Sequence, residues 1–156
     1  MGIGLMQLSA QSDKNDGNHA VAYWLNEQIG YFPLVCSDVA PKFFGDPDFE
    51  WLTAIVNIHV VEKWKNGQLN STIWKVHWEP ATSTWGEVFN VNEKDILSPE
   101  YYQDGEKLAT DYWYANIIGN LGHQYHLCIK VDWTYIGPDP DDWNAVAFTV
   151  IKAECR

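Results

Sequence analysis

The chain has 156 residues, with 21 acidic and 10 basic side chains and a formal net charge of -11. A chain of this length fits one domain, because folding buries roughly two thirds of the unfolded surface at this size. The charge disfavours nucleic acid and anionic membranes as partners, since both bind through clustered cations. Apolar runs stay short of the roughly 18 residues that a spanning helix needs, which predicts a soluble protein.

The first ten residues lack the positively charged segment of a signal peptide. Two locations therefore remain open, the inside of the cell and, for a mature chain, the outside.

The chain is expected to begin with an arm and a helix. Residues 1–17 are polar and contain glycine, which predicts a flexible arm before a single domain over 18–156. Apolar side chains then recur at helical spacing, at Val21, Ala22, Leu25 and Ile29. Gly30 follows at the position of a C-terminal cap, so the pattern predicts one N-terminal helix over 19–29.

A long β-hairpin over 51–79 is the strongest local signal. Two alternating segments flank Asn66-Gly67, a dipeptide typical of a hairpin turn. A two-residue loop would pair Ile58 with Lys75 and mix core with polar side chains on one face. We therefore expect a three-residue loop with Gly67 in a bulge. This loop pairs Val60 with Thr72, Ile58 with Trp74, Val56 with Val76 and Ala54 with Trp78.

Four more strands are expected after the hairpin, over 85–91, 110–118, 123–136 and 144–155. Ser98-Pro99-Glu100 indicates a helical turn on the connection between the first two. Strands in sequential antiparallel order must cover their apolar face by curving, by stacking or by wrapping a helix. The sequence therefore predicts a mainly β fold, with α+β as the alternative. Its form is a curved antiparallel sheet or meander barrel of about six strands.

Nine tryptophans and eight tyrosines offer large flat apolar surfaces. Strict alternation on the second-last strand places Tyr125, Trp133 and Tyr135 on one face. Together with Trp74 and Trp78 of the hairpin, they either fill a core or line a cavity for a ligand. These residues are the candidate binding site for an apolar or aromatic small molecule.

Four polar residues are candidates for acid/base catalysis if the protein is an enzyme. His77 and Glu79 share one face of a strand, about 6–7 Å apart by strand rise, while His126 and Asp132 share a face of another. Such groups could serve a cofactor-free cyclase, isomerase or dehydratase. A solvated outer face explains the same residues.

No metal ion or cofactor is expected. The spacing of His123-x-x-His126 sends the two side chains to opposite faces of a strand. The acidic loops 46–50 and 139–142 lack the order of an EF-hand, which favours solvated turns over calcium sites. Phosphate-binding glycine loops and dinucleotide motifs do not occur in the sequence.

The three cysteines are Cys36, Cys128 and Cys155. Cys128 and Cys155 lie near opposite ends of the expected terminal hairpin. A cross-strand disulfide that leaves Cys36 free is one interpretation, and buried free cysteines are the other.

The layout of a helix, a long hairpin, a broad insertion and a terminal hairpin with Cys128 and Cys155 resembles that of secreted cystatins. Trp143 stands near the second hairpin turn, where that family keeps a Trp. The family's Gln-x-Val-x-Gly motif is absent, because the segment 59–63 offers only two valines. The resemblance implies a protein-binding module that inhibits proteases.

The aromatic composition favours non-covalent binding of a small molecule as the function. A cofactor-free enzyme on the same scaffold is the first alternative, and a protein-binding module is the second.

Overall fold

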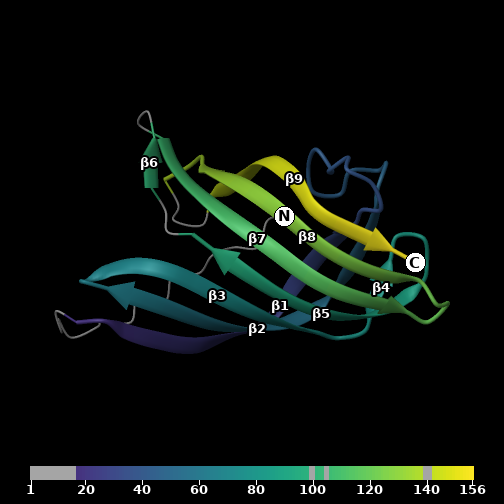
Figure 1. Cartoon of the computed structure of the whole chain (residues 1–156), viewed down its shortest axis with the longest axis horizontal. Helices are drawn as coiled ribbons and strands as arrows, with labels where there is room; N and C mark the ends of the chain where they lie inside the picture. Colours follow the sequence, from purple (N-terminus) through teal and green to yellow (C-terminus); the bar gives the residue numbers. More distant parts are fainter. Residues whose placement is uncertain (1–16, 99–100, 104–105, 139–141) are drawn as a thin grey trace.

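Antiparallel strands make up most of the computed structural model, which describes residues 17–98, 101–103, 106–138 and 142–156. The strands are β1 (His19–Leu34), β2 (Glu50–Lys65), β3 (Gln68–Trp78), β4 (Ala81–Ser83), β5 (Val88–Leu97), β6 (Tyr101–Gln103), β7 (Glu106–Gly119), β8 (Gln124–Tyr135) and β9 (Trp143–Cys155). They form one sheet in the order β1-β2-β3-β5-β7-β8-β9, in which β4 pairs with β2 and β5, and β6 pairs with β7 (Figure 1).

The prediction of a mainly β fold with an antiparallel sheet is confirmed. The six expected strands correspond to β2, β3, β5, β7, β8 and β9, and the sheet adds β1, β4 and β6. Residues 1–16 of the expected arm, Pro99 and Glu100 of the expected helical turn, and 139–141 of the second acidic loop lie outside the described residues. The described residues contain no helix that could cross a membrane.

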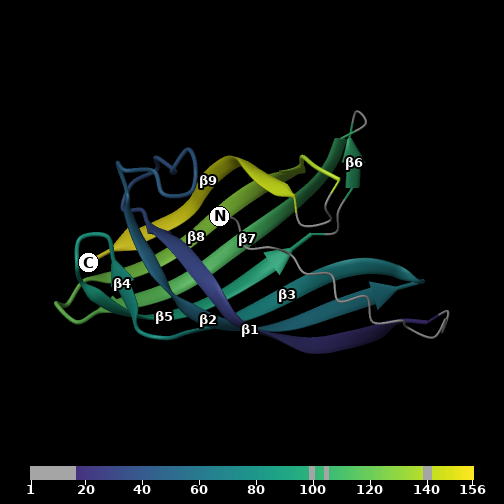
Figure 2. The same cartoon turned by 180° about the vertical axis from the view of Figure 1, so that it is seen from behind.

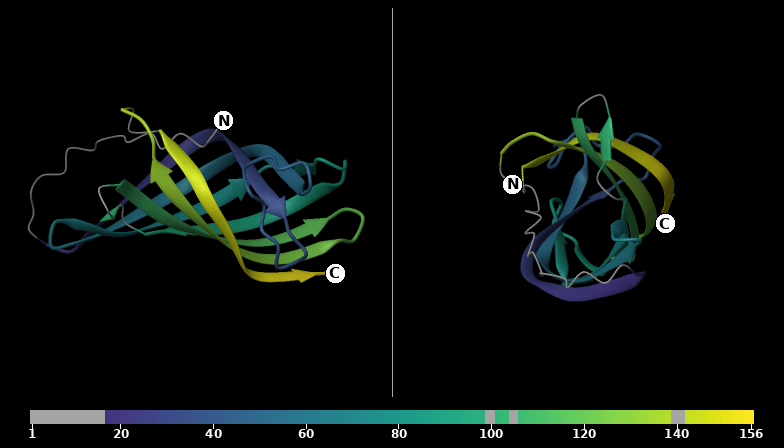
Figure 3. Two further views of the ribbon diagram at one scale, coloured as in Figure 1. Left: turned by 90° about the horizontal axis from the view of Figure 1, so that it is seen from above. Right: turned by 90° about the vertical axis from the view of Figure 1, so that its left-hand side faces the viewer.

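The sheet curls strongly about its long axis, as the end-on view shows (Figure 3). This curl brings the end of β1 onto the concave side, where Phe32, Leu34 and Val35 join one buried cluster with residues of β7 and β8. The connection between β1 and β2 lies beside β9 (Figure 2), and its Phe44 packs against Phe148 with ring centroids 5.5 Å apart. The core therefore forms inside the curl.

The helix predicted over 19–29 is wrong, because this segment belongs to β1. Val21, Tyr23 and Leu25 are half-buried and alternate with more exposed residues, and the strand pairs with β2 along its whole length. A β-bulge between Leu25 and Gln28 shifts the alternation by one residue. The bulge made the apolar spacing look helical, although Ile29 is 51% exposed.

The hairpin exists, but its predicted register is wrong. Asn66 and Gly67 both have positive φ, at 52° and 73°, which makes a two-residue turn. A bulge at Asn70, between the pairs Trp64–Leu69 and Lys63–Ser71, then shifts the ladder by one residue. The resulting pairs are Val60 with Trp74, Ile58 with Val76 and Val56 with Trp78. The predicted inward face is confirmed, since these valines, Ile58 and Trp74 are all buried.

The cross-strand Cys128–Cys155 disulfide, one of the two interpretations of the cysteines, is also wrong. Cys36 bonds to Cys155, with Cα atoms 5.6 Å apart, and Cys128 is buried and free. On the β8–β9 ladder Cys128 lies opposite Lys152, three residues away from Cys155, so the two sulfurs cannot meet. The observed bond instead ties the end of β1 to the end of β9.

Gly30 packs so closely against Val56 and Trp78 that no side chain fits at its position. A Cβ atom there would lie 2.6 Å from Val56 Cγ1 and 2.9 Å from Trp78 Cη2. We expect Gly30→Ala to lower the free energy of unfolding by roughly 1–3 kcal/mol, because Val56 or Trp78 must move. Urea denaturation followed by tryptophan fluorescence measures this loss.

The matched control for Gly30→Ala is Gly17→Ala. A Cβ on Gly17 meets no atom within 4 Å, so its effect should stay within about 0.5 kcal/mol. Equal denaturation midpoints for the two variants would show that Gly30 is not packed as described.

Candidate functional site

A cavity lies on the concave side of the sheet, and five tryptophans are among the residues that line it. Its five tryptophans come from β3, β7, β8 and β9 and are Trp74, Trp78, Trp113, Trp133 and Trp143. The cavity has a volume of about 50 Å³, enough for roughly three to five waters at 10–15 Å³ each. The interior is thus nearly filled by aromatic side chains, with a small space left between them.

Three acidic residues line the same cavity. They are Glu93 and Asp95 on β5 and Asp111 on β7, and they are only 6%, 5% and 4% exposed. Glu93 and Asp95 are two residues apart, so both point to the concave face. Asp111 lies opposite Leu97 on the neighbouring strand. Carboxyl groups are rarely buried this deeply unless a partner compensates for the lost water.

Two of these carboxyl groups accept hydrogen bonds from indoles of the lining. Trp78 Nε1 donates to Glu93 Oε2, and Trp113 Nε1 donates to Asp111 Oδ2, each at 2.5 Å. Trp74 lies opposite Asp95 on the β3–β5 ladder, but no hydrogen bond joins its indole to that carboxyl group. The indoles therefore supply part of what the buried acids need.

Three polar atoms of the lining have no hydrogen-bond partner among the described residues: Trp74 Nε1, Asp95 Oδ1 and Asp111 Oδ1. Folded proteins satisfy nearly all buried polar atoms with protein groups or bound molecules. One donor and two acceptors in the lining thus have no partner among the described residues.

Burial favours the protonated form of these acids and therefore raises their pKa values. It raises the pKa of Glu93 to about 8 and that of Asp111 to about 7, against the opposing hydrogen bonds from Trp78 and Trp113. Burial also raises the pKa of Asp95 well above its usual value, and repulsion from Glu93 and Asp111 adds to this. All three shifts therefore favour the protonated form of these carboxyl groups.

No positive side chain balances the acids, since the described residues that line the cavity include no Lys, Arg or His. Nor does the described part of the chain contain a group of three or more His, Cys, Asp or Glu placed to hold a metal ion. The small cavity thus combines aromatic side chains with three buried acids and, among the described residues, no positive side chain.

Three of the five predicted binding residues, Trp74, Trp78 and Trp133, line this cavity. Tyr125 packs elsewhere in the core, with its ring 5.8 Å from that of Phe89. Tyr135 is the last residue of β8, and its ring lies 5.7 Å from Trp143 and 5.1 Å from the Nζ of Lys107.

The histidine and glutamate of the hairpin lie on the outer face. His77 packs against Trp24, a residue 51% exposed, at 5.3 Å between rings. Trp24 also contacts His59 at 4.9 Å, because the two residues are partners on the β1–β2 ladder. The β2–β3 register places His77 diagonally across from His59 on the same face. Glu79 is exposed at the end of the hairpin. None of these four residues lines the cavity.

The other two catalytic candidates also form outer-face contacts. His126 Nδ1 lies 2.6 Å from Asn116 Oδ1. Asp132 accepts from the Thr110 hydroxyl at 2.9 Å and from Lys130 Nζ at 2.9 Å. The contacts with Asn116 and Thr110 join β8 to β7, and the contact between Lys130 and Asp132 lies within β8. Neither His126 nor Asp132 lines the cavity.

Sequence reasoning missed the three acids that do enter the cavity. The predicted third strand ended at Val91, so Glu93 and Asp95 fell in an apparent connection. The overlooked signal is the alternation of acids with exposed residues beyond Val91, and the place of Asp111 between Ala109 and Trp113 on an otherwise apolar face.

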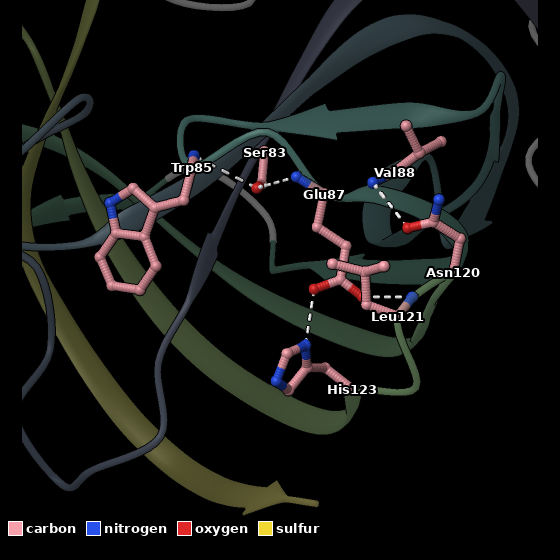
Figure 4. A network of polar contacts seen from close by, with 7 residues as sticks. All are labelled: Ser83, Trp85, Glu87, Val88, Asn120, Leu121 and His123. Carbon is pink, nitrogen blue, oxygen red and sulfur yellow. Dashed lines mark hydrogen bonds and ion pairs between the residues drawn. The ribbon is translucent and has the colours of Figure 1, made fainter.

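A separate polar network surrounds Glu87 between β4 and β5 (Figure 4). The Glu87 carboxylate accepts from Leu121 N at 3.0 Å and lies 2.6 Å from His123 Nδ1. Ser83 Oγ in turn accepts from the backbone N of Glu87 at 3.2 Å. This network fixes the β7–β8 turn against the β4–β5 turn, which is a structural role.

Comparisons of the chain with protein-family models, with curated proteins and with solved structures found no match. The geometry of the tryptophan-lined cavity therefore carries the functional argument.

Proposed function

We propose that the protein binds a small apolar or aromatic molecule without covalent chemistry, inside the tryptophan-lined cavity. The observation that carries this proposal is the convergence of five indoles from four strands on an unfilled interior space. Pockets for small molecules have this character, an apolar wall with a few placed polar groups. A ligand of a few heavy atoms fits the present volume, and a ring requires the indoles to shift.

A panel of small apolar and aromatic compounds tests the proposal. At 100 times the Kd, binding adds about 2.7 kcal/mol to the free energy of unfolding, which raises the Tm by roughly 5–10 °C. We expect at least one of indole, benzyl alcohol and isobutanol to do this and to quench tryptophan fluorescence. Thermal unfolding and fluorescence titration are the measurements.

A cavity-filling variant identifies the place of binding. Ala109 is 5% exposed and lines the cavity, so Ala109→Phe should abolish the thermal shift. His77→Ala, on the outer face, should preserve it. If no compound shifts the Tm of the parent protein, or if Ala109→Phe binds as well as the parent, the proposal fails.

A cofactor-free enzyme in the same cavity is the second candidate, and one observation favours it. Burial raises the pKa of Glu93 to about 8 and that of Asp111 to about 7, values that suit a general acid near neutral pH. The catalytic groups would then be these acids, and not His77, Glu79, His126 or Asp132. Turnover lost in Glu93→Gln while ligand binding persists would distinguish the enzyme from a simple binder.

Two features of the layout that resembles cystatins are not found in the structure. The expected helix is part of β1, and the disulfide joins Cys36 to Cys155 instead of Cys128 to Cys155. Both features supported the resemblance in layout.

A further inference from the structure

The acidic wall of the cavity is the feature that simple apolar binding leaves unexplained. Glu93, Asp95 and Asp111 are each at least nine-tenths buried. An apolar ligand would leave Asp95 Oδ1 and Asp111 Oδ1 without hydrogen-bond donors. Buried acceptors without partners destabilise a complex, so a ligand that supplies donors binds better than one that does not.

We propose that the ligand is a small organic cation, an amine on an apolar or aromatic body, whose ammonium group contacts Asp95 and Asp111. This inference rests on the proposed function and names the chemical class of its ligand. An ammonium group carries several N–H donors and no acceptor, which matches the two unpartnered carboxyl oxygens. Its charge is the one that the described cavity lining lacks.

The tryptophans support the same class of ligand. Cations bind the faces of aromatic rings, and tryptophan is the strongest partner. Five indoles surround the acids, so a cation can contact both ring faces and carboxylates in an environment with little water. Attraction between charges is stronger there than at the protein surface.

The unpartnered Trp74 Nε1 refines the class, because it is a donor and an ammonium group cannot accept its hydrogen bond. A hydroxyl or carbonyl oxygen near the amine would fill that role, as would a retained water molecule. An amine with a neighbouring oxygen therefore satisfies all three atoms at once.

Binding of a cation should be coupled to the release of protons. The raised pKa values of Glu93 and Asp111 mean that part of the acidic wall is protonated in the empty protein at pH 7. A cation favours the ionised carboxylates and displaces these protons. Affinity for an amine should therefore rise as the pH increases from about 6 to about 8, while the affinity for a neutral compound should not.

Water is the competing occupant. One water molecule donates two hydrogen bonds and accepts others, so it could also satisfy the three unpartnered atoms. If water is the natural occupant, a charged ligand should bind no more tightly than a neutral ligand of the same shape. The experiment must therefore compare ligands that differ in charge but not in shape.

Isothermal titration of the full chain at pH 8 with benzylamine, benzyl alcohol and benzoate makes that comparison. Isobutylamine and isobutanol form a smaller pair in case the ring is too large. We expect an amine to bind at least tenfold tighter than its alcohol, and benzoate to show no binding. Asp95→Asn and Asp111→Asn should each remove most of this preference and keep the affinity for the alcohol, whereas Asp132→Asn on the outer face should leave both affinities unchanged.

The outcomes separate the inference from the proposed function. If an alcohol binds and its amine binds no tighter, the protein is a small-molecule binder, but the inference of a cationic ligand is overturned. If the preference persists in both cavity variants, the acids do not cause it and the inference also fails. If neither the alcohols nor the amines bind, the proposed function falls as well.

Discussion

The free energy of unfolding should fall by several kcal/mol as the pH rises from about 4.5 to about 8. The ordinary pKa of a glutamate is 4.5, and burial raises that of Glu93 to about 8. The pKa of Asp111 rises from 3.8 to about 7, again mainly through burial. Each pKa unit corresponds to about 1.4 kcal/mol, so these groups together dominate the pH dependence of stability.

The sign follows from where the protons bind. Between pH 4.5 and about 8 the folded protein keeps the Glu93 proton that the unfolded chain loses. Because the folded state then binds more protons, stability decreases as the pH rises. The contribution is complete below pH 4.5 and is lost as the pH passes the folded pKa. An ordinary surface carboxylate in a salt bridge gives the opposite trend.

Urea denaturation at pH 5 and pH 8 measures this effect. Glu93→Gln and Asp111→Asn keep an oxygen that can accept from Trp78 or Trp113 but cannot ionise, so each should reduce the loss of stability between the two pH values. Glu154→Gln, an exposed residue on β9, should leave the loss unchanged. A parent protein that is more stable at pH 8 than at pH 5 would contradict the burial of these acids.

Reduction of the Cys36–Cys155 bond should lower the free energy of unfolding by about 4–5 kcal/mol. The bond closes a loop with a sequence separation of 119 residues, and the chain-entropy estimate for a loop near this size is about 4.7 kcal/mol. The bond also holds β1 and β9 together, the two strands at the ends of the sheet order. Cys36→Ser should have the same effect as a reducing agent.

Denaturation with and without a reducing agent, followed through the change in midpoint, gives the size of the effect. Thiol labelling of the native protein should modify no cysteine rapidly, because Cys128 is buried and the other two are bonded. Cys128→Ala serves as the control and should keep the sensitivity to reduction. Peptide mapping that finds Cys128 in a disulfide, or an unchanged midpoint after reduction, would overturn the assignment.

The inward face of the hairpin was predictable because alternation is a local property. Val56, Ile58 and Val60 show it on their own strand, whatever their partners. The pairing was not predictable in the same way, since a single bulge at Asn70 moves every later pair by one residue. Such bulges arise from backbone geometry and leave only a weak trace in the order of residues.

Long-range features could not be predicted from the sequence for a different reason. The disulfide depends on the curl that brings Cys36 near Cys155, and the curl is a property of the whole sheet. The acids of the cavity were missed because the predicted strand ended before Glu93, and an acidic residue is normally placed on the solvent side. If the alternating pattern had been extended beyond Val91, the predicted strand would have included Glu93 and Asp95 on its inward face.

The bulge in β1 also fixes where this strand can change length. Two residues, Asn26 and Glu27, stand there opposite the single Asn57. Deletion of Glu27 would restore a regular ladder, and the side chains in both halves of β1 would keep their present orientation toward the core or the solvent. Loss of Trp24 would turn Val21 and Tyr23 away from the core. The fold therefore tolerates a deletion at the bulge of β1. A deletion elsewhere in the strand changes which side chains face the core.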